Sequence, residues 1–161
     1  MDTREIELKL EHMNWQRLLT ALCNERLVNL AEEISAPWQV EHVALPQVGL
    51  GMLQLVDGAF EQPFYLGEFP VATCQLQLTL PTGEKIKGAA QVMSDDQSQA
   101  QALAIFDAVI RHNLEGIEAV MSLVQEGQIQ CDAEDHERRA MLMATRVEFS
   151  ELSEAGDDDE D

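Results

Sequence analysis

Hydrophobic and polar side chains alternate strictly over residues 72–80. The even positions are apolar and the odd positions are threonine or glutamine: Ala72, Cys74, Leu76, Leu78 and Leu80 against Thr73, Gln75, Gln77 and Thr79. A period of two residues is typical of a β-strand with one buried and one wetted face. Pro81 and Gly83 suit a turn, after which residues 85–92 return as a second strand. The pattern predicts a hairpin over residues 64–92 as the centre of the fold.

Helical periodicity flanks this hairpin on both sides. Apolar residues three or four apart predict an amphipathic helix over residues 3–22, then a shorter helix capped by Asn24 and ended by Pro37. After the hairpin, residues 94–96 begin a long helix, because Ser or Asp can cap it and acids in the first turn suit the helix dipole. A break is predicted near residues 112–116.

Two further strands are predicted before the hairpin. Residues 38–43 alternate as a strand, and Pro46 interrupts the pattern. Residues 49–56 then form either a second strand or a ligand-facing loop with strand character. Asp57-Gly58 follows as a turn signal.

Three elements are predicted towards the C-terminus. A helix over residues 114–125 is expected to stop at Gly127, and another helix is expected over residues 134–144. Residues 145–149 read as a short strand.

The element order predicts an α+β fold, with an antiparallel sheet, N-terminal helices and a long helix after the central hairpin. The length of 161 residues suits one domain, which we assign to residues 1–152. Residues 153–161 end in five consecutive acids and are expected to be a disordered tail.

The net charge of −20 excludes several classes of partner. A field of this sign repels nucleic acid and anionic membranes, and it repels free phosphate compounds unless a local basic pocket overrides it. The bases are scattered except for Arg138-Arg139, which are close to Arg146. No apolar run reaches the roughly 20 residues that a membrane span needs, and the charged N-terminus lacks the apolar core of a signal peptide. We therefore expect a cytoplasmic protein.

The candidate chemistry is sparse. Cys131 and His136 would supply only one pair of zinc ligands, so a solvated charged turn is the favoured interpretation. Cys74 lies on the apolar strand face and is interpreted as a core residue rather than a nucleophile. Gly49-Leu50-Gly51 is too short for a dinucleotide motif and is attributed to backbone geometry, and the chain has no P-loop. Met141-Leu142-Met143 is interpreted as core, with a partner surface as the alternative.

Four segments in register resemble the G subunit (PhnG) family of the bacterial carbon–phosphorus lyase system for phosphonate breakdown. They are the Pro-Gly-apolar segment 46–52, the aromatic-x-Leu-Gly-Glu entry at 64–73, the Ala-rich helix 100–108 with Phe106-Asp107-Ala108, and Ala-Thr-Arg-Val-Glu-Phe at 144–149. Two positions depart from the family pattern, since Ser94-Asp95 replaces a glycine followed by a base and Ser150 replaces an aromatic.

The resemblance implies a subunit of a hetero-oligomeric core complex with the H, I, J and L subunits. In that family the G, H, I and L subunits are associated with attaching a phosphonate to the ribose of ATP with release of adenine. The I subunit carries the nucleosidase activity, and the J subunit carries the iron–sulfur radical chemistry. The resemblance supplies no catalytic residue for this chain and implies no cofactor or metal bound by it, ATP being a substrate of the complex.

Candidate functional or interface residues under this interpretation are Gly67, Glu68 and Arg146. An exposed strand edge, Trp15, Trp38 and the methionines would form the docking surface.

Two other classes of function remain open at this point. An acidic adaptor that masks a basic partner would have no connection with phosphonates and would bind in a salt-sensitive way. An independent metal-dependent enzyme would contain metal when purified.

Overall fold

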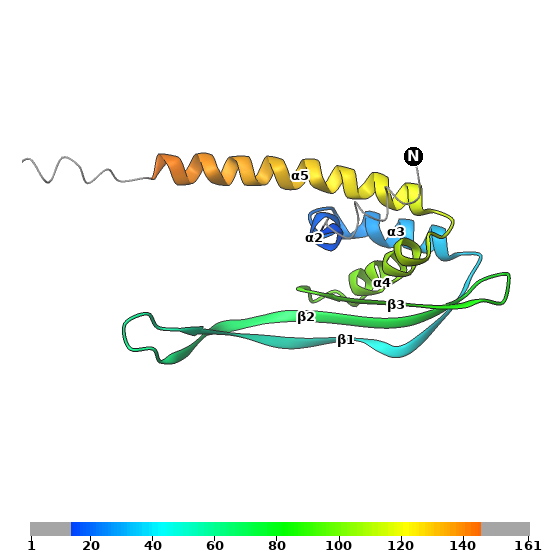
Figure 1. The fold of residues 1–161 in the computed structure, drawn as a ribbon, viewed down its shortest axis with the longest axis horizontal. Helices are drawn as coiled ribbons and strands as arrows, with labels where there is room; N and C mark the ends of the chain where they lie inside the picture. Colours follow the sequence, from blue (N-terminus) through cyan, green and yellow to red (C-terminus); the bar gives the residue numbers. More distant parts are fainter. Residues whose placement is uncertain (1–13, 146–161) are drawn as a thin grey trace, which may run out of the picture.

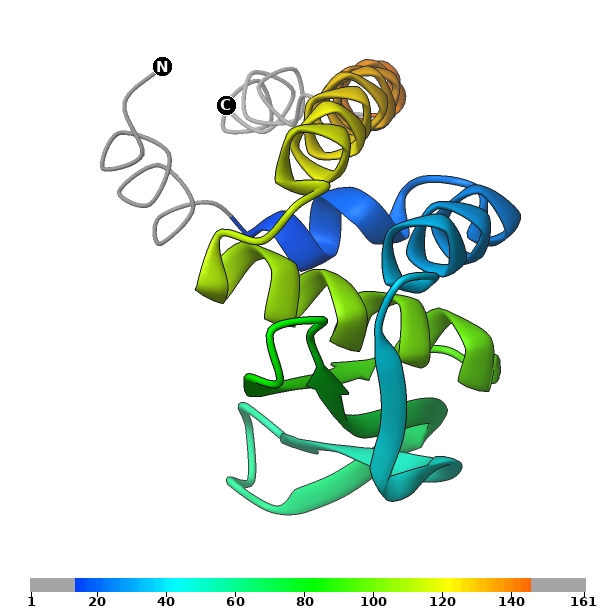
Figure 2. The same cartoon turned by 90° about the vertical axis from the view of Figure 1, so that its right-hand side faces the viewer.

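The computed structural model describes residues 14–145, in which helices are stacked on one face of a three-stranded antiparallel sheet (Figure 1). The elements are α2 (Trp15–Thr20), α3 (Asn24–Ser35), β1 (Gln39–Val56), β2 (Pro63–Thr79), β3 (Lys85–Val92), α4 (Gln97–His112) and α5 (Ile117–Ala144). Figure 2 shows α4 between the sheet and the α2–α3 level, with α5 farthest from the sheet. The predicted α+β class is confirmed.

The predicted hairpin is present as β2 and β3. The apolar positions of β2 face the helices and are almost completely buried at Ala72, Cys74, Leu76 and Leu78. Gly83 has a φ of 85° in the turn, a conformation that favours glycine. The alternating pattern therefore identified both the strand and its buried face.

Helix α4 forms the centre of the hydrophobic core. It packs against β2 and β3, and its residues from Ala102 to Ile110 are all buried. The helix approaches β3 so closely at Gly88 that a Cβ there would lie 2.1 Å from the carbonyl oxygen of Ala104. Asp107 is 5% exposed and accepts a hydrogen bond from the backbone N–H of Ala89 at 3.1 Å, which ties the helix to the edge of β3.

The structure corrects the prediction of two separate strands before the hairpin. β1 is one strand that continues through Pro46. Its pairing with β2 shifts between His42 and Ala44 and again between Ala44 and Gln47. A proline is tolerated there because β1 lies at the edge of the sheet and its ladder is irregular at that point.

The cap of α3 also differs from the prediction. Cys23 occupies the N-cap position and makes no side-chain capping bond. Asn24 instead directs its amide towards Asp96, the N-cap of α4, and donates a hydrogen bond to its carboxylate. The residue therefore joins two helices rather than capping one.

The prediction that a helix stops at Gly127 is wrong. α5 continues through this glycine to Ala144 and includes the helix predicted over residues 134–144. A Cβ at Gly127 would lie 2.1 Å from the carbonyl oxygen of Leu18, so the glycine allows α5 to pack closely on α2. The break predicted near residues 112–116 is confirmed, with Asn113 and Gly116 in left-handed conformations.

Several predictions concern residues beyond those described. Of the helix predicted over residues 3–22, the described residues include α2 and not residues 3–13. Of the strand predicted over residues 145–149, they include only Thr145, which is the C-cap of α5. The assignment of one domain over residues 1–152 and of a tail over residues 153–161 stays a prediction. None of the helices described between residues 14 and 145 has the length and apolar character that crossing a membrane requires.

Candidate interaction surface

The β1–β2 hairpin extends far beyond the helices as a two-stranded ribbon, here defined as residues 48–71 (Figure 1). β3 ends opposite Ala72, so the ribbon has no third strand in the part of the chain that the structure describes. An isolated two-stranded hairpin is at best marginally stable in water. The ribbon thus needs either intrinsic twist and side-chain packing or a partner to hold it.

The ribbon exposes an unusual amount of apolar surface. Its exposed large apolar side chains are Val48, Leu50, Met52, Leu53, Leu55, Val56, Phe60, Phe64, Tyr65 and Leu66. Leu50 is 71% exposed and Phe60 is 79% exposed. Single exposed apolar residues are ordinary, but a contiguous set of this size marks an interaction site.

One face of the ribbon continues the buried face of the sheet. Val48 is paired with Ala72, which is fully buried under the helices. Because strand side chains alternate, Leu50 and Met52 lie on the same face as Val48. The apolar face that the helices cover in the body therefore continues uncovered along β1.

On the opposite face of the ribbon, Gly51 leaves room for the ring of Phe69. The ring of Phe69, the residue paired with Gly51, lies directly over the glycine, and a Cβ there would be 2.6 Å from two ring carbons. This close approach explains a glycine in a strand. It agrees with the prediction that Gly49-Leu50-Gly51 serves backbone geometry.

Two of the three predicted site residues lie in the ribbon. Gly67 is paired with Leu53 and Glu68 is paired with Met52, and both are exposed. A Cβ at Gly67 would meet nothing within 4 Å, so this position leaves open backbone surface. Arg146 lies outside the described residues, so its grouping with Gly67 and Glu68 stays a prediction.

The C-terminal half of α5 is the second projecting element. It extends past α2 in the same direction as the ribbon (Figure 1). Met141, Leu142 and Met143 are between 59% and 69% exposed. The interpretation of Met141-Leu142-Met143 as core is therefore wrong, and the alternative of a partner surface fits the exposure.

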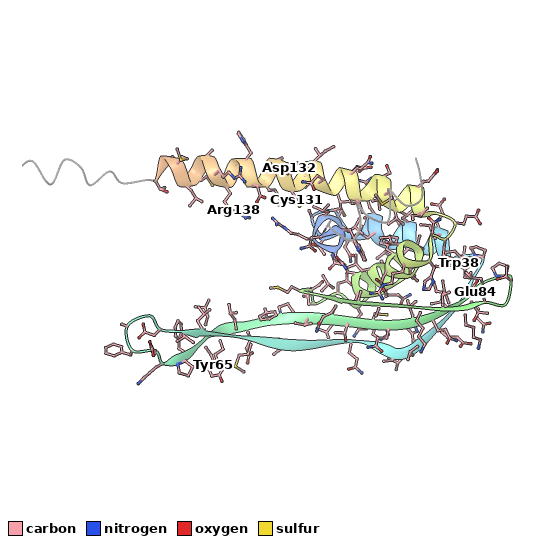
Figure 3. The ribbon with its side chains drawn as sticks, in the orientation of Figure 1. Trp38, Tyr65, Glu84, Cys131, Asp132 and Arg138 are labelled. Carbon is pink, nitrogen blue, oxygen red and sulfur yellow. The ribbon has the colours of Figure 1, made fainter. Side chains whose placement is uncertain are left out.

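The two tryptophans predicted as docking surface contribute little exposed area. Trp15, on α2, is 7% exposed and belongs to the hydrophobic core. Trp38 is partly buried against the same core, at the end of the sheet opposite to the ribbon, where Figure 3 labels it. Figure 3 also shows Tyr65, near the far end of the ribbon, as one aromatic side chain that remains open to solvent.

The charge of the ribbon has one sign. Residues 43–83 contain three carboxylates and no Lys, Arg or His. The carboxylates belong to Asp57, Glu61 and Glu68, and the first two lie in the loop at the tip. A partner face with basic residues near the tip would complement this surface.

Within residues 14–145, Cys131 and His136 do not take part in a metal site. This residue is 8% exposed within α5, against α2, so the predicted charged turn is not present. His136 is exposed, and among residues 14–145 no group of three His, Cys, Asp or Glu side chains is arranged to hold a metal ion. Asp135 instead pairs with Arg17 and Arg138, each at 3.5 Å.

Asp107, Cys74 and His42 have local structural surroundings that do not indicate catalysis. Asp107 accepts a hydrogen bond from Arg111 Nε at 2.8 Å in addition to its bond with Ala89. Burial raises the pKa of the Cys74 thiol, which is 1% exposed, so the core interpretation of Cys74 fits better than a nucleophile. His42 is exposed and contacts Gln101 Oε1 at 3.0 Å through its Nε2.

An open depression of ≈ 400 Å³ on the sheet carries no charge. Its lining residues are Ala44, Leu45, Gln47, Thr73, Cys74, Gln75, Ala89, Ala90 and Gln91. Amides and one threonine suit hydrogen bonding but do not neutralise a phosphate. This depression therefore offers no site for a phosphate, whereas the exposed ribbon offers an interaction surface.

The sequence contains a signal for this surface that the predicted strands do not reflect. Apolar residues in the distal part of β1 occur at both even and odd positions, as in the adjacent pair Met52-Leu53. A strand with one face in water alternates, whereas an apolar run indicates a strand to be covered on both faces. In the described structure neither face of the ribbon is covered.

Comparisons with known proteins agree with the resemblance drawn from the four segments. A family model described as "Phosphonate metabolism protein PhnG" matches residues 11–154. A protein of Rhizobium meliloti (strain 1021), named alpha-D-ribose 1-methylphosphonate 5-triphosphate synthase subunit PhnG, is 32% identical over 124 residues. The alignment covers 73% of this chain and 76% of that relative.

Proposed function

The chain belongs to the PhnG family of phosphonate metabolism proteins, and on that premise we propose that it is a subunit of an alpha-D-ribose 1-methylphosphonate 5-triphosphate synthase. Its role is to support the transfer of a phosphonate to the ribose of ATP with release of adenine. The observation that carries the proposal is the family match over residues 11–154. The acidic adaptor unrelated to phosphonates gains no support from either comparison.

The proposed role is structural association rather than chemistry by this chain alone. The exposed ribbon and the exposed end of α5 provide apolar surface for obligate partners. The proposed partners are the H, I, J and L subunits of the carbon–phosphorus lyase system, in a hetero-oligomer. The chain binds no cofactor of its own under this proposal, and the complex works in the cytoplasm, where its substrate ATP is available.

Co-expression tests the proposal directly. The full chain is produced with the H, I, J and L subunits of the same organism, purified through a tag on the I subunit, and separated by size. We expect the chain to co-elute with the other subunits, and we expect formation of alpha-D-ribose 1-methylphosphonate 5-triphosphate from ATP and methylphosphonate to be lost when the chain is omitted. Full activity without the chain, or failure to co-elute, would contradict the proposal.

The chain by itself is expected to show no measurable binding of ATP. A net charge of −20 repels the triphosphate, and the open depression on the sheet has no basic residue. Isothermal calorimetry of the isolated full chain with ATP checks this expectation, and the assembled complex serves as the positive control. Tight binding by the isolated chain would refute a purely supporting role.

A further inference from the structure

We propose that the outer edge of β1, over residues 48–56, receives an extended strand from a different protein subunit and so becomes an inner strand of a larger sheet. This inference rests on the proposed function, because it describes how the chain joins its complex. It concerns backbone hydrogen bonds along one strand edge, beyond the apolar side chains already described.

The first observation is that this edge has no neighbour in the described structure. The strand order is β1-β2-β3, so β1 is paired on one side only. Its pairing with β2 is regular from Val48 to Leu53 and resumes from Gln54 to Val56. The shift between Leu53 and Gln54 leaves Leu66 of β2 without a partner, so the irregularity lies in β2 and the edge of β1 stays even.

The second observation is that the features that keep an edge strand from pairing with another chain are absent from residues 48–56 of β1. Native proteins guard edge strands with charges, prolines and bulges. In β1 these features all lie before residue 48, namely Glu41, Pro46 and the register shifts between His42 and Gln47. Residues 48–56 contain no charged residue and no proline. An edge left open in this way is a template for another strand.

The third observation identifies which backbone groups of β1 point outward. Pro63 and Pro70 of β2 have no N–H to donate and are paired with Val56 and Leu50. A proline in a ladder occupies a position whose nitrogen faces away from the neighbouring strand. Bonded and non-bonded pairs alternate in an antiparallel ladder, so Leu50 and Val56 direct their own N–H and C=O away from β2.

The same alternation extends the set of outward positions. The backbone N–H and C=O groups of Met52 and Gln54 point away from β2, as those of Leu50 and Val56 do. The backbone groups of residues 51, 53 and 55 point towards β2 and bond to it. The backbone N–H of Asp57, next after Val56, donates to Gln62 O across the hairpin at 2.9 Å, which fits this phase. Four outward N–H groups on a segment without a charged residue suit an incoming strand.

The charge of the ribbon indicates which kind of strand binds to the β1 edge. The ribbon carries the carboxylates of Asp57, Glu61 and Glu68 and no base, so the incoming segment should be apolar with a Lys or Arg near the tip. A second copy fits poorly, because antiparallel pairing of two β1 edges would place each acidic tip against another chain of net charge −20. The strand is therefore assigned to a different subunit.

Hydrogen exchange tests the inference on the full chain, alone and within the co-expressed complex of H, I, J and L subunits. We expect the N–H groups of residues 50, 52, 54 and 56 to exchange rapidly in the isolated chain and to become protected in the complex. The N–H groups of residues 51, 53 and 55 should be slower in both. A complex whose even-numbered N–H groups remain fast would overturn the strand addition while leaving the proposed function intact.

Two other outcomes also contradict the inference. Protection of the even-numbered positions in the isolated chain would assign the edge to a second copy if it depends on concentration, or to this chain's own residues outside 14–145 if it does not. Failure of the complex to form would overturn the proposed function and the inference together. Each outcome is distinguished by the same pair of exchange measurements.

A pair of variants provides an independent readout. Met52→Pro removes one outward N–H, and Met52→Ala removes the side chain but keeps the backbone donor. We expect the proline variant to weaken association at least roughly tenfold more than the alanine variant. Equal losses would show that only the side chain contributes. Exchange of residues 51 and 53 in each isolated variant verifies that the ribbon remains paired.

Discussion

At the scale of single residues, Asp96 holds the start of α4 in place. Its carboxylate accepts a hydrogen bond from the Ser98 backbone N–H at 2.8 Å and others from the Ser98 hydroxyl and Asn24. The side-chain and backbone bonds from Ser98 lower the pKa of Asp96 from its ordinary value of 3.8. The charged form is therefore the one that stabilises the helix start.

This arrangement predicts a pH-dependent loss in Asp96→Ala. Because the folded-state pKa is lowered, the stabilisation is complete well above pH 3.8 and disappears as the pH falls through the folded-state value. We expect the variant to lose about 1 kcal/mol of unfolding free energy at pH 7, and the difference from wild type to shrink below pH 3.8. Urea unfolding at several pH values measures it. Asp95→Ala, at the exposed neighbour, is the control and should change little.

Adding a single carbon atom at Gly88 should destabilise the protein. In Gly88→Ala the new Cβ would meet the Ala104 carbonyl oxygen at 2.1 Å, and neither backbone can yield cheaply. We expect a loss of about 1–3 kcal/mol in unfolding free energy, measured by urea denaturation. Gly49→Ala is the matched control in a strand, since its Cβ would meet nothing within 4 Å. Equal stability of the two variants would contradict the close α4–β3 packing.

At the scale of elements, the ribbon and the body should respond differently to the same substitution. Leu76→Ala opens a cavity at a fully buried position of β2 and should cost about 2–5 kcal/mol in unfolding free energy. Leu50→Ala removes a side chain that is 71% exposed, so the isolated chain should keep its stability while association with the other subunits weakens. Thermal unfolding and co-purification of both variants separate the two effects. A large loss of stability in Leu50→Ala would mean that the ribbon belongs to the chain's own core.

Elements with a strict local pattern were predictable from the sequence. The period of two over residues 72–80 located β2 and its buried face, and residues 94–96 marked the start of α4, where Asp96 is the N-cap. The errors arose where tertiary contacts override local signals. Gly127 reads as a helix stop, but it is the residue that allows α5 to approach Leu18, and no local pattern contains that contact.

The candidate surface was predictable only in part. Gly67 and Glu68 lie in the exposed ribbon, but their functional role stays a prediction, and the sequence did not indicate the apolar residues around them. Met141-Leu142-Met143 reads as core because apolar residues usually are, and only the projection of α5 beyond α2 shows otherwise. An apolar run in a sequence does not show whether the residues that pack against it belong to the same chain or to a partner.

At the scale of the whole molecule, charge and apolar surface are separated. The chain has a net charge of −20, whereas the ribbon has three carboxylates among many exposed apolar side chains. The charge keeps free chains apart and repels anionic reactants, and the apolar surface favours association with a partner that can cover it. These properties support the proposal that the chain contributes shape and contact area to a complex.

This separation predicts how the assembly responds to salt. Burying apolar area is not weakened by ionic strength, so the co-purified complex should persist when sodium chloride rises from 0.1 M to about 1 M, where screening shortens the Debye length from roughly 10 Å to 3 Å. An assembly held by the acidic charge alone would dissociate over that range, which is the behaviour expected of an acidic adaptor. Sedimentation of the complex at both salt concentrations distinguishes the cases. Glu68→Gln, which removes a ribbon charge without changing its shape, should leave the high-salt affinity unchanged and slow the association rate only at low salt.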